Sequence, residues 1–413
     1  MTLNHVDPVH SMSAIAERDQ LTDAPVDSGE SARLWHLDIV SLDTVREQWL
    51  ALEAYGLASP YQRYDWVRAY ARHALASDGA ELQIVRVASP GGRALAILPL
   101  AVRRKTGMTT ASFVGGKHAN FHMGVFDPGF AARLDDSGAL QLLNDAAAAM
   151  GGVDAFILHY QPITWNGIAN PLARIDAQPS PSQAYKLPLL ADCDATLANS
   201  MSSHARKKHK NKRARFSELG PSQMLIASTK AEQARILEVF FRQKALRFAQ
   251  MSVPDPFSDV GVRQFLTQAA ADGAIELAAL ELNGALVATY VGAVHQGRFT
   301  GMATSFEPDP AVMKVSPGEI LLIELIRHQC RKGLSVFDLG VGEARYKATI
   351  CNQTEDLVDS FIAITPKGRL VAWMSRELQR IKRAIKASPL AFAVLARLRK
   401  LRPVRPQPSG DQA

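Results

Sequence analysis

A segment near the end of the chain combines glycines, acids, a tyrosine and a lysine at a spacing that could support catalysis. It reads Val336-Phe-Asp-Leu-Gly-Val-Gly-Glu-Ala-Arg-Tyr-Lys, which predicts a short buried strand ending at two glycines. Glycines at the end of a strand allow a ligand to approach the backbone closely. We predict Tyr346 as a proton donor or acceptor-site hydroxyl, because the neighbouring Lys347 favours the phenolate form. The candidate bases are Asp338 and Glu343, and a strand-to-helix turn with solvated charges is the alternative interpretation.

A second segment, Lys314-Val-Ser-Pro-Gly-Glu, lies between a predicted strand and a long helix with apolar periodicity. Ser316 is expected as the N-cap, and Glu319 three residues later completes a capping box. Backbone N–H groups at such a helix start bind anions, Gly318 allows close approach and Lys314 adds positive charge. The alternative is an ordinary capped helix with nothing bound. The predicted cofactor-binding residues are Lys314, Ser316, Gly318 and Gly340.

The net charge of +7 is unevenly distributed along the chain. Seven lysines and arginines and no acid lie in residues 206–215, and twelve lie in residues 367–405 against the single Glu377. The first cluster predicts a basic helix that is either a solvated linker or a binder of phosphate-rich substrates, RNA or anionic membrane. No aromatic residue alternates with its cations, so a stacking surface for single-stranded RNA is not expected.

Four further side chains are predicted to bind substrate. Lys244 and Arg247 lie three residues apart on one face of an expected helix over 237–251, and with Lys347 they would bind negative charge. Asn120 is a candidate for the acceptor pocket in the first half of the chain. The histidines show no paired metal spacing, and the three cysteines indicate neither a disulfide framework nor a zinc site.

An internal repeat predicts the elements that must position these residues. Residues 67–87 and 262–282 both read as an amphipathic helix, an Asp-Gly turn and a strand, and residues 92–102 and 284–294 read as the strand that follows. Two copies of one domain are the simplest interpretation. Hairpin strands followed by a helix and another strand indicate an α/β (α+β) class with mixed, largely antiparallel sheets flanked by helices. We expect a strand over 357–365 to end the second copy.

Composition limits the class of protein. Hydrophobic residues make up 47% and charged residues 21%, the balance of a globular chain, which excludes a wholly disordered, fibrous or small disulfide-rich protein. No apolar run reaches the roughly 18 residues that a membrane-spanning helix needs. The first thirty residues lack the apolar core of a signal peptide, so we expect a cytoplasmic protein.

Four motifs in order resemble a known family. They are Gln243-Lys-Ala-Leu-Arg-Phe, Asp255-Pro-Phe, Ser316-Pro-Gly-Glu-Ile-Leu-Leu, and Phe337-Asp-Leu-Gly-Val-Gly-Glu followed by Tyr346-Lys347. The series resembles bacterial acyltransferases of the GNAT superfamily, of the CelD type associated with cellulose and exopolysaccharide synthesis. Their distant relatives are the FemAB-type peptidyltransferases. The resemblance covers roughly residues 35–386.

The resemblance implies tandem GNAT-like domains that use acetyl-CoA or another acyl-CoA as co-substrate and no metal, with the pyrophosphate held at 316–318. The expected organisation is a disordered leader (1–32), a first domain on the acceptor side (33–190), a basic linker helix (191–220), a second domain on the acyl-donor side (221–387) and a basic C-terminal tail (388–413).

Three functions remain open at this point. The first is an acyltransferase that moves an acyl group from acyl-CoA to a sugar or amine acceptor, in polysaccharide or cell-envelope biosynthesis. The second is a FemAB-like transferase with aminoacyl-tRNA as donor, which is the one role foreseen for a nucleic acid. The third is a non-catalytic GNAT-like binding or regulatory protein. We expect a small-molecule or glycan acceptor, and peripheral association of residues 388–402 with an anionic inner membrane is a further hypothesis.

Overall fold

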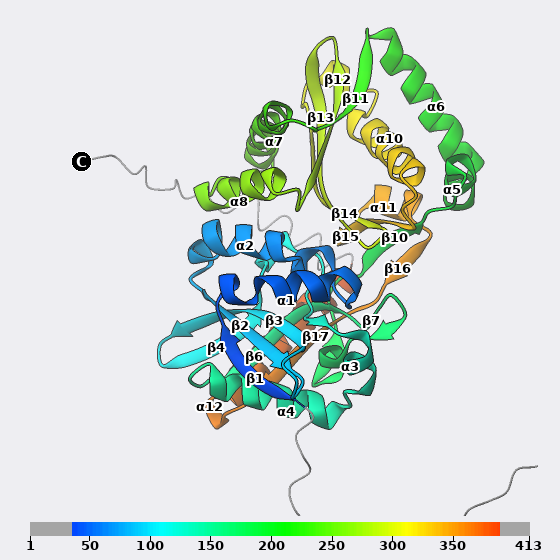
Figure 1. Cartoon of the computed structure of the whole chain (residues 1–413). Coiled ribbons are helices and arrows are strands. Elements are labelled where there is room, and N and C mark those ends of the chain that lie inside the picture. The colour runs from blue at the N-terminus through cyan, green and yellow to red at the C-terminus, as the bar shows by residue number, and fades with distance from the viewer. Residues whose placement is uncertain (1–34, 389–413) are drawn as a thin grey trace, which may run out of the picture. The chain divides into compact units, whose positions relative to one another are not determined.

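The computed structural model describes residues 35–388 and builds them on two mixed sheets flanked by helices (Figure 1). The predicted class is confirmed, since each sheet is mainly antiparallel with one parallel pair. The expectations for residues 1–32 and 389–413 lie outside the described residues. Within residues 35–388, no helix has both the length and the hydropathy to cross a membrane.

The first sheet contains strands from the first half of the chain and one from its end. In spatial order its strands are β1 (His36–Val40), β2 (Glu81–Ala88), β3 (Ala94–Lys105), β4 (Met108–Phe113), β6 (Ala155–Pro162), β17 (Leu357–Ala363) and β9 (Ala177–Pro179), with β5 (Val125–Phe126) beside β3. Its helices are α1 (Leu42–Tyr55), α2 (Tyr64–His73), α3 (Pro128–Arg133), α4 (Asp136–Ala149) and α12 (Pro366–Ala387). A small hairpin, β7 (Thr164–Trp165) and β8 (Ile168–Ala169), stands apart from the sheet.

The second sheet follows the same plan. In spatial order its strands are β11 (Ser222–Ile226), β12 (Glu276–Leu282), β13 (Ala285–His295), β14 (Arg298–Phe306), β15 (Val336–Val341), β10 (Ala184–Pro188) and β16 (Gln353–Glu355). Its helices are α5 (Cys193–Ser200), α6 (Ser203–Glu218), α7 (Lys230–Gln250), α8 (Val260–Ala271), α9 (Pro310–Met313), α10 (Pro317–Arg331) and α11 (Arg345–Ile350).

The two predicted repeats form the same three elements, α2–β2–β3 and α8–β12–β13. Their two helices also pack against each other. Phe265 of α8 meets Trp66 and Tyr70 of α2 edge-on, with ring centroids 5.0 and 5.1 Å apart, and Arg68 pairs with Asp272 at 3.0 Å. Equivalent surfaces of the two copies therefore bury each other's aromatic rings.

Two strands cross between the copies. β17, which was expected in the second sheet, pairs with β6 and β9 of the first, so that expectation is wrong. β10 lies before the basic helix in the chain but pairs with β15 and β16 of the second sheet. Each sheet is thus completed by a strand from the other half of the chain, while the predicted domain boundaries stay predictions.

The basic helix is not a free linker, because α6 packs against α10 (Figure 1). Nine of the fifteen residues of α10 are buried. A helix that buries so many of its residues must be covered on more than one side. The second sheet covers one side of α10, and α5 and α6 cover another.

Candidate functional site

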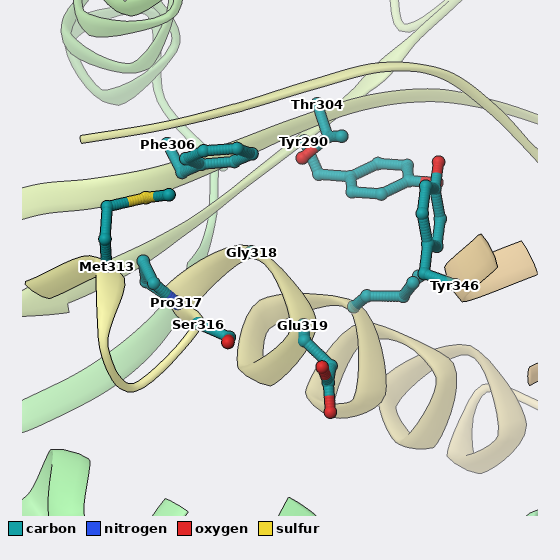
Figure 2. Close-up of a pocket in the computed structure, with 10 residues that line it drawn as sticks. Tyr290, Thr304, Phe306, Met313, Ser316, Pro317, Gly318, Glu319 and Tyr346 are labelled. Carbon is teal, nitrogen blue, oxygen red and sulfur yellow. The ribbon is translucent and has the colours of Figure 1, made fainter. Parts of the chain in front are cut away.

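A cavity of about 210 Å³ opens at the N-terminal end of α10 (Figure 2). Its walls come from β13, β14, the α9–α10 turn and the start of α11. The lining residues are Tyr290, Thr304, Phe306, Met313, Ser316, Pro317, Gly318, Glu319, Leu322 and Tyr346. In Figure 2 the Tyr290 and Tyr346 rings lie side by side, and Phe306 and Met313 lie at the other end. The cavity is largely apolar, with a few hydroxyls and one carboxylate, as ligand sites commonly are.

Beside this cavity, β14 and β15 part from each other. They pair in parallel only from Arg298 to Thr300 of β14. Beyond that point the Asn120 side chain bridges the two strands. Its Nδ2 donates to the Gly301 carbonyl at 2.8 Å, and the Val341 N–H donates to its Oδ1 at 3.1 Å. Asn120, predicted to bind substrate, thus satisfies backbone groups that the parting strands leave unpaired.

Gly340 makes room for this bridge. Its φ of +73° is in the left-handed region, and a Cβ built on it would lie 2.6 Å from both amide atoms of Asn120. A glycine at this strand end was predicted to admit a ligand, whereas in the structure the close neighbour is Asn120. Gly340 lies outside the residues that line the cavity.

The start of α10 differs from the predicted capping box. Ser316 has φ +57° and ψ +65°, and its side chain makes no capping hydrogen bond within the described residues. Glu319 instead accepts from the Lys212 Nζ of α6 at 2.5 Å, so the capping-box prediction is wrong. A non-glycine residue in the left-handed region costs roughly 1–2 kcal/mol. Because Ser316 precedes Pro317, the right-handed helical region is disfavoured for it.

Three of the predicted residues meet at the cavity, namely Ser316, Gly318 and Tyr346, whereas Lys314 is exposed outside the lining set. A Cβ on Gly318 would lie 3.1 Å from the Phe306 ring, so glycine keeps this wall open. Tyr346 is 38% exposed, and burial of its hydroxyl raises its pKa above the usual value.

Lys347 does not act on Tyr346 as predicted. Its Nζ donates to the carbonyls of Gly340 and Val341, at 3.1 and 2.9 Å, and therefore ties down the turn after β15. The expectation that Lys347 favours the phenolate of Tyr346 is wrong, since the pKa of Tyr346 is raised. A protonated phenol at neutral pH can donate a proton but does not serve as a base.

Asp338 belongs to a buried ion network outside the lining of the cavity. It accepts from the Gly340 N–H at 2.6 Å and pairs with Arg298 at 3.1 Å. Arg298 also lies 3.6 Å from Glu355 and stacks over the Trp165 ring at 4.1 Å. Burial raises the pKa of Asp338 to about 6, although Arg298 acts in the opposite direction.

The remaining predicted residues lie apart from the cavity. Glu343 lies 3.7 Å from the Lys386 ammonium, at the start of the turn before α11. Arg247 is exposed on α7. Lys244 lies over three phenylalanine rings at 5.1 to 5.7 Å, and burial lowers its pKa to about 8. The geometry does not bring these three to the cavity, and their roles in binding or catalysis stay predictions.

The sequence analysis missed the walls contributed by β13 and β14. Tyr290 lies in an apolar run that reads as core, and Thr304 and Phe306 alternate like any half-buried strand. Their spacing of two residues places them on one face, which was the available signal. Which face borders a cavity depends on the helix packed above it.

The comparisons with known proteins agree with this geometry. Residues 203–348 match the family model described as acetyltransferase (GNAT) domain. The matched segment includes α6, the cavity and Tyr346. The search of curated proteins found no match.

Solved structures resemble the chain over most of its length. Against a crystal structure of FemX the TM-score is 0.59 at 10% identity, covering 82% of this chain and 100% of that one. Against the C-terminal domain of a putative lysylphosphatidylglycerol synthetase from Agrobacterium fabrum the TM-score is 0.50 at 12% identity, covering 82% and 97%. A conserved protein of unknown function from Bacteroides thetaiotaomicron gives 0.50 at 11% identity, covering 79% and 99%. At these identities the likeness shows the fold alone. The resemblance to GNAT proteins is confirmed, and the CelD type stays a prediction.

Proposed function

We propose that the chain is an acyltransferase that moves an acetyl or other acyl group from acyl-CoA to a sugar or amine acceptor. The observation that supports it is the cavity at the start of α10, next to the parting strands β14 and β15, inside the segment that matches the GNAT acetyltransferase model. A narrow apolar cavity suits a thioester and its acyl chain, and the left-handed Ser316 turn with Gly318 suits the phosphates that precede them. Lys314 and Gly340 complete the proposed donor site.

The reaction needs an acid and a base. The acceptor nitrogen or oxygen bonds to the thioester carbon, the carbon–sulfur bond breaks, the acceptor loses a proton and the leaving thiolate gains one. Tyr346 is the proposed acid, because its raised pKa keeps the phenol protonated. Asp338 and Glu343 are the proposed bases.

The acceptor is proposed to be a small molecule or glycan whose negative charge, if any, would be bound by Lys244, Arg247 and Lys347. A CelD-type role in polysaccharide or cell-envelope biosynthesis is part of the same proposal. Such a role suits a cytoplasmic protein peripheral to the inner membrane, held there by residues 388–402, which lie almost wholly outside the described part. Loss of co-sedimentation with anionic vesicles on deletion of these residues is the expected result for that location.

Release of free thiol from acetyl-CoA, measured across a panel of amines and glycans, tests the activity. We expect turnover with at least one acceptor class, and a large loss for Tyr346→Phe. Calorimetric titration with CoA is the companion measurement. If neither CoA binding nor thiol release is detected, the proposal is wrong.

A second donor, aminoacyl-tRNA, is favoured by one observation, the fold similarity to FemX over that whole chain. The exposed cations of α6, including Lys207 and Lys208, would then contact the phosphate backbone. Binding of tRNA that weakens steeply with salt, and is abolished by neutralising residues 206–215, would support this donor. Ligand binding without any turnover would instead favour a non-catalytic role.

A further inference from the structure

A larger groove of about 790 Å³ lies between α5, α6 and α10. α6 contributes side chains at positions 206, 209, 210, 213 and 217, which helical spacing places on one face. α10 contributes Glu324 and Arg327, and α5 contributes Asp194. We propose that this groove binds the phosphate groups of a small molecule that carries a diphosphate.

Two cations of the groove have no partner of opposite charge among the residues that the structure describes. Arg213 lies 3.5 Å from Glu324, and Arg327 lies 2.7 Å from Asp194, so these two are paired. For Arg206 and Lys210, no carboxylate of residues 35–388 lies within ion-pair distance. Guanidinium and ammonium groups that face a concave site without a counterion are suited to bind phosphate.

A largely buried imidazole, that of His209, also lines the groove. His209 is only 8% exposed, and its Nδ1 has no hydrogen-bond partner in the described part of the chain. The carboxylate of Glu319 is 4.0 Å from this nitrogen, beyond hydrogen-bond distance. Buried polar atoms in native proteins are normally satisfied. This nitrogen has almost no exposed surface and faces Glu319, so it is not open to the groove, and the proposal rests on Arg206 and Lys210.

The chemistry of the lining favours a small phosphate ligand over a polynucleotide. None of the groove residues is Phe, Tyr or Trp, so successive bases have no ring to stack on. The volume is in the range of small-molecule sites. Phosphate could reach the groove on the nucleotide end of the acyl donor or on a separate phosphorylated acceptor. Glu319 lines the cavity at the start of α10 and accepts a hydrogen bond from Lys212 of α6, the helix that lines the groove.

The test is calorimetric titration of the full chain with inorganic pyrophosphate and with ADP. Arg206→Gln/Lys210→Gln removes the two groove cations that make no ion pair within residues 35–388. Lys207→Gln/Lys208→Gln removes the same charge from the exposed side of the same helix. We expect affinity to fall about tenfold or more for the groove variant and less than about twofold for the control, since direct phosphate contacts outweigh long-range charge. Matching thermal unfolding of both variants checks that the fold is intact.

Equal weakening in both variants would overturn the proposal, and so would a lack of pyrophosphate binding at millimolar concentration. Repeating the titration with saturating CoA distinguishes the two sources. Competition assigns the groove to the nucleotide end of the donor, and simultaneous binding assigns it to a second ligand; both support a phosphate site. The proposal does not rest on acyl transfer, so a failure to detect turnover leaves this result standing.

Discussion

The side-chain amide of Asn120 occupies the space in which any residue other than glycine at position 340 would place its Cβ. The two residues are far apart in sequence, and their contact joins a loop of the first copy to the end of β15. Through it, Asn120 holds Gly301 and Val341 at the point where β14 and β15 part. The point at which the two strands part, beside the cavity at the start of α10, is thus held by a residue from the other copy.

A double-mutant cycle tests this contact. Gly340→Ala should destabilise through the left-handed φ, at roughly 1–2 kcal/mol, and through the clash with Asn120 in addition. Asn120→Ala should cost about 1–3 kcal/mol because two backbone groups lose their partner. In the double variant the clash disappears. Its loss of stability should therefore be smaller than the sum of the losses in the two single variants, by about 1 kcal/mol or more. Urea unfolding measures all four proteins, and strict additivity would contradict the contact.

Removal of the Tyr346 hydroxyl tests the proposed acid. Tyr346→Phe should lower kcat by about 10²–10⁴-fold, the range for lost general acid–base catalysis, and leave KM for the donor nearly unchanged. Tyr55→Phe, on an exposed ring that lies outside the cavity lining, is the matched control. Similar kcat values for the two variants would show that the Tyr346 hydroxyl transfers no proton.

Asp338 should give an unusual pH dependence of stability. Its folded pKa of about 6 is above the unfolded value of 3.8, so its protonated form stabilises the fold at low pH and this contribution is lost as pH rises through 6. Asp338→Asn does not titrate. Between pH 4 and pH 7 the free energy of unfolding of the wild type should therefore fall, relative to that of the variant, by up to about 3 kcal/mol. Urea unfolding of both proteins across this range measures the effect. If the wild type instead gains stability relative to the variant as pH rises, the ion pair with Arg298 has a larger effect on the pKa of Asp338 than burial has.

Lys244 should change the pH dependence of stability in the opposite direction. Its folded pKa of about 8 is below the usual 10.5, so the charged form destabilises the fold below pH 8 and the cost disappears as pH rises toward 10.5. Lys244→Met should raise the melting temperature at pH 7, with an advantage that shrinks above pH 8. Thermal unfolding between pH 7 and 10.5 measures this, with the exposed Lys230→Met on the same helix as control. A gain that does not change with pH would show that the three phenylalanine rings stabilise the ammonium fully.

Local patterns in the sequence determined the elements and part of the site. The repeat predicted both helix–strand–strand units because amphipathic periodicity and Asp-Gly turns act within a few residues. The same local reasoning selected Ser316, Gly318 and Tyr346, which the structure places at the cavity.

Only the tertiary structure decided what those elements contact. The crossing of β10 and β17, the Lys212–Glu319 pair in place of a capping box, and the Asn120–Gly340 contact each join segments about 100 or more residues apart. Their free energy comes from burial and pairing across the folded chain, and no local pattern records it. The same holds for Asp338, whose pKa is raised by burial in the folded chain and lowered by Arg298, 40 residues away.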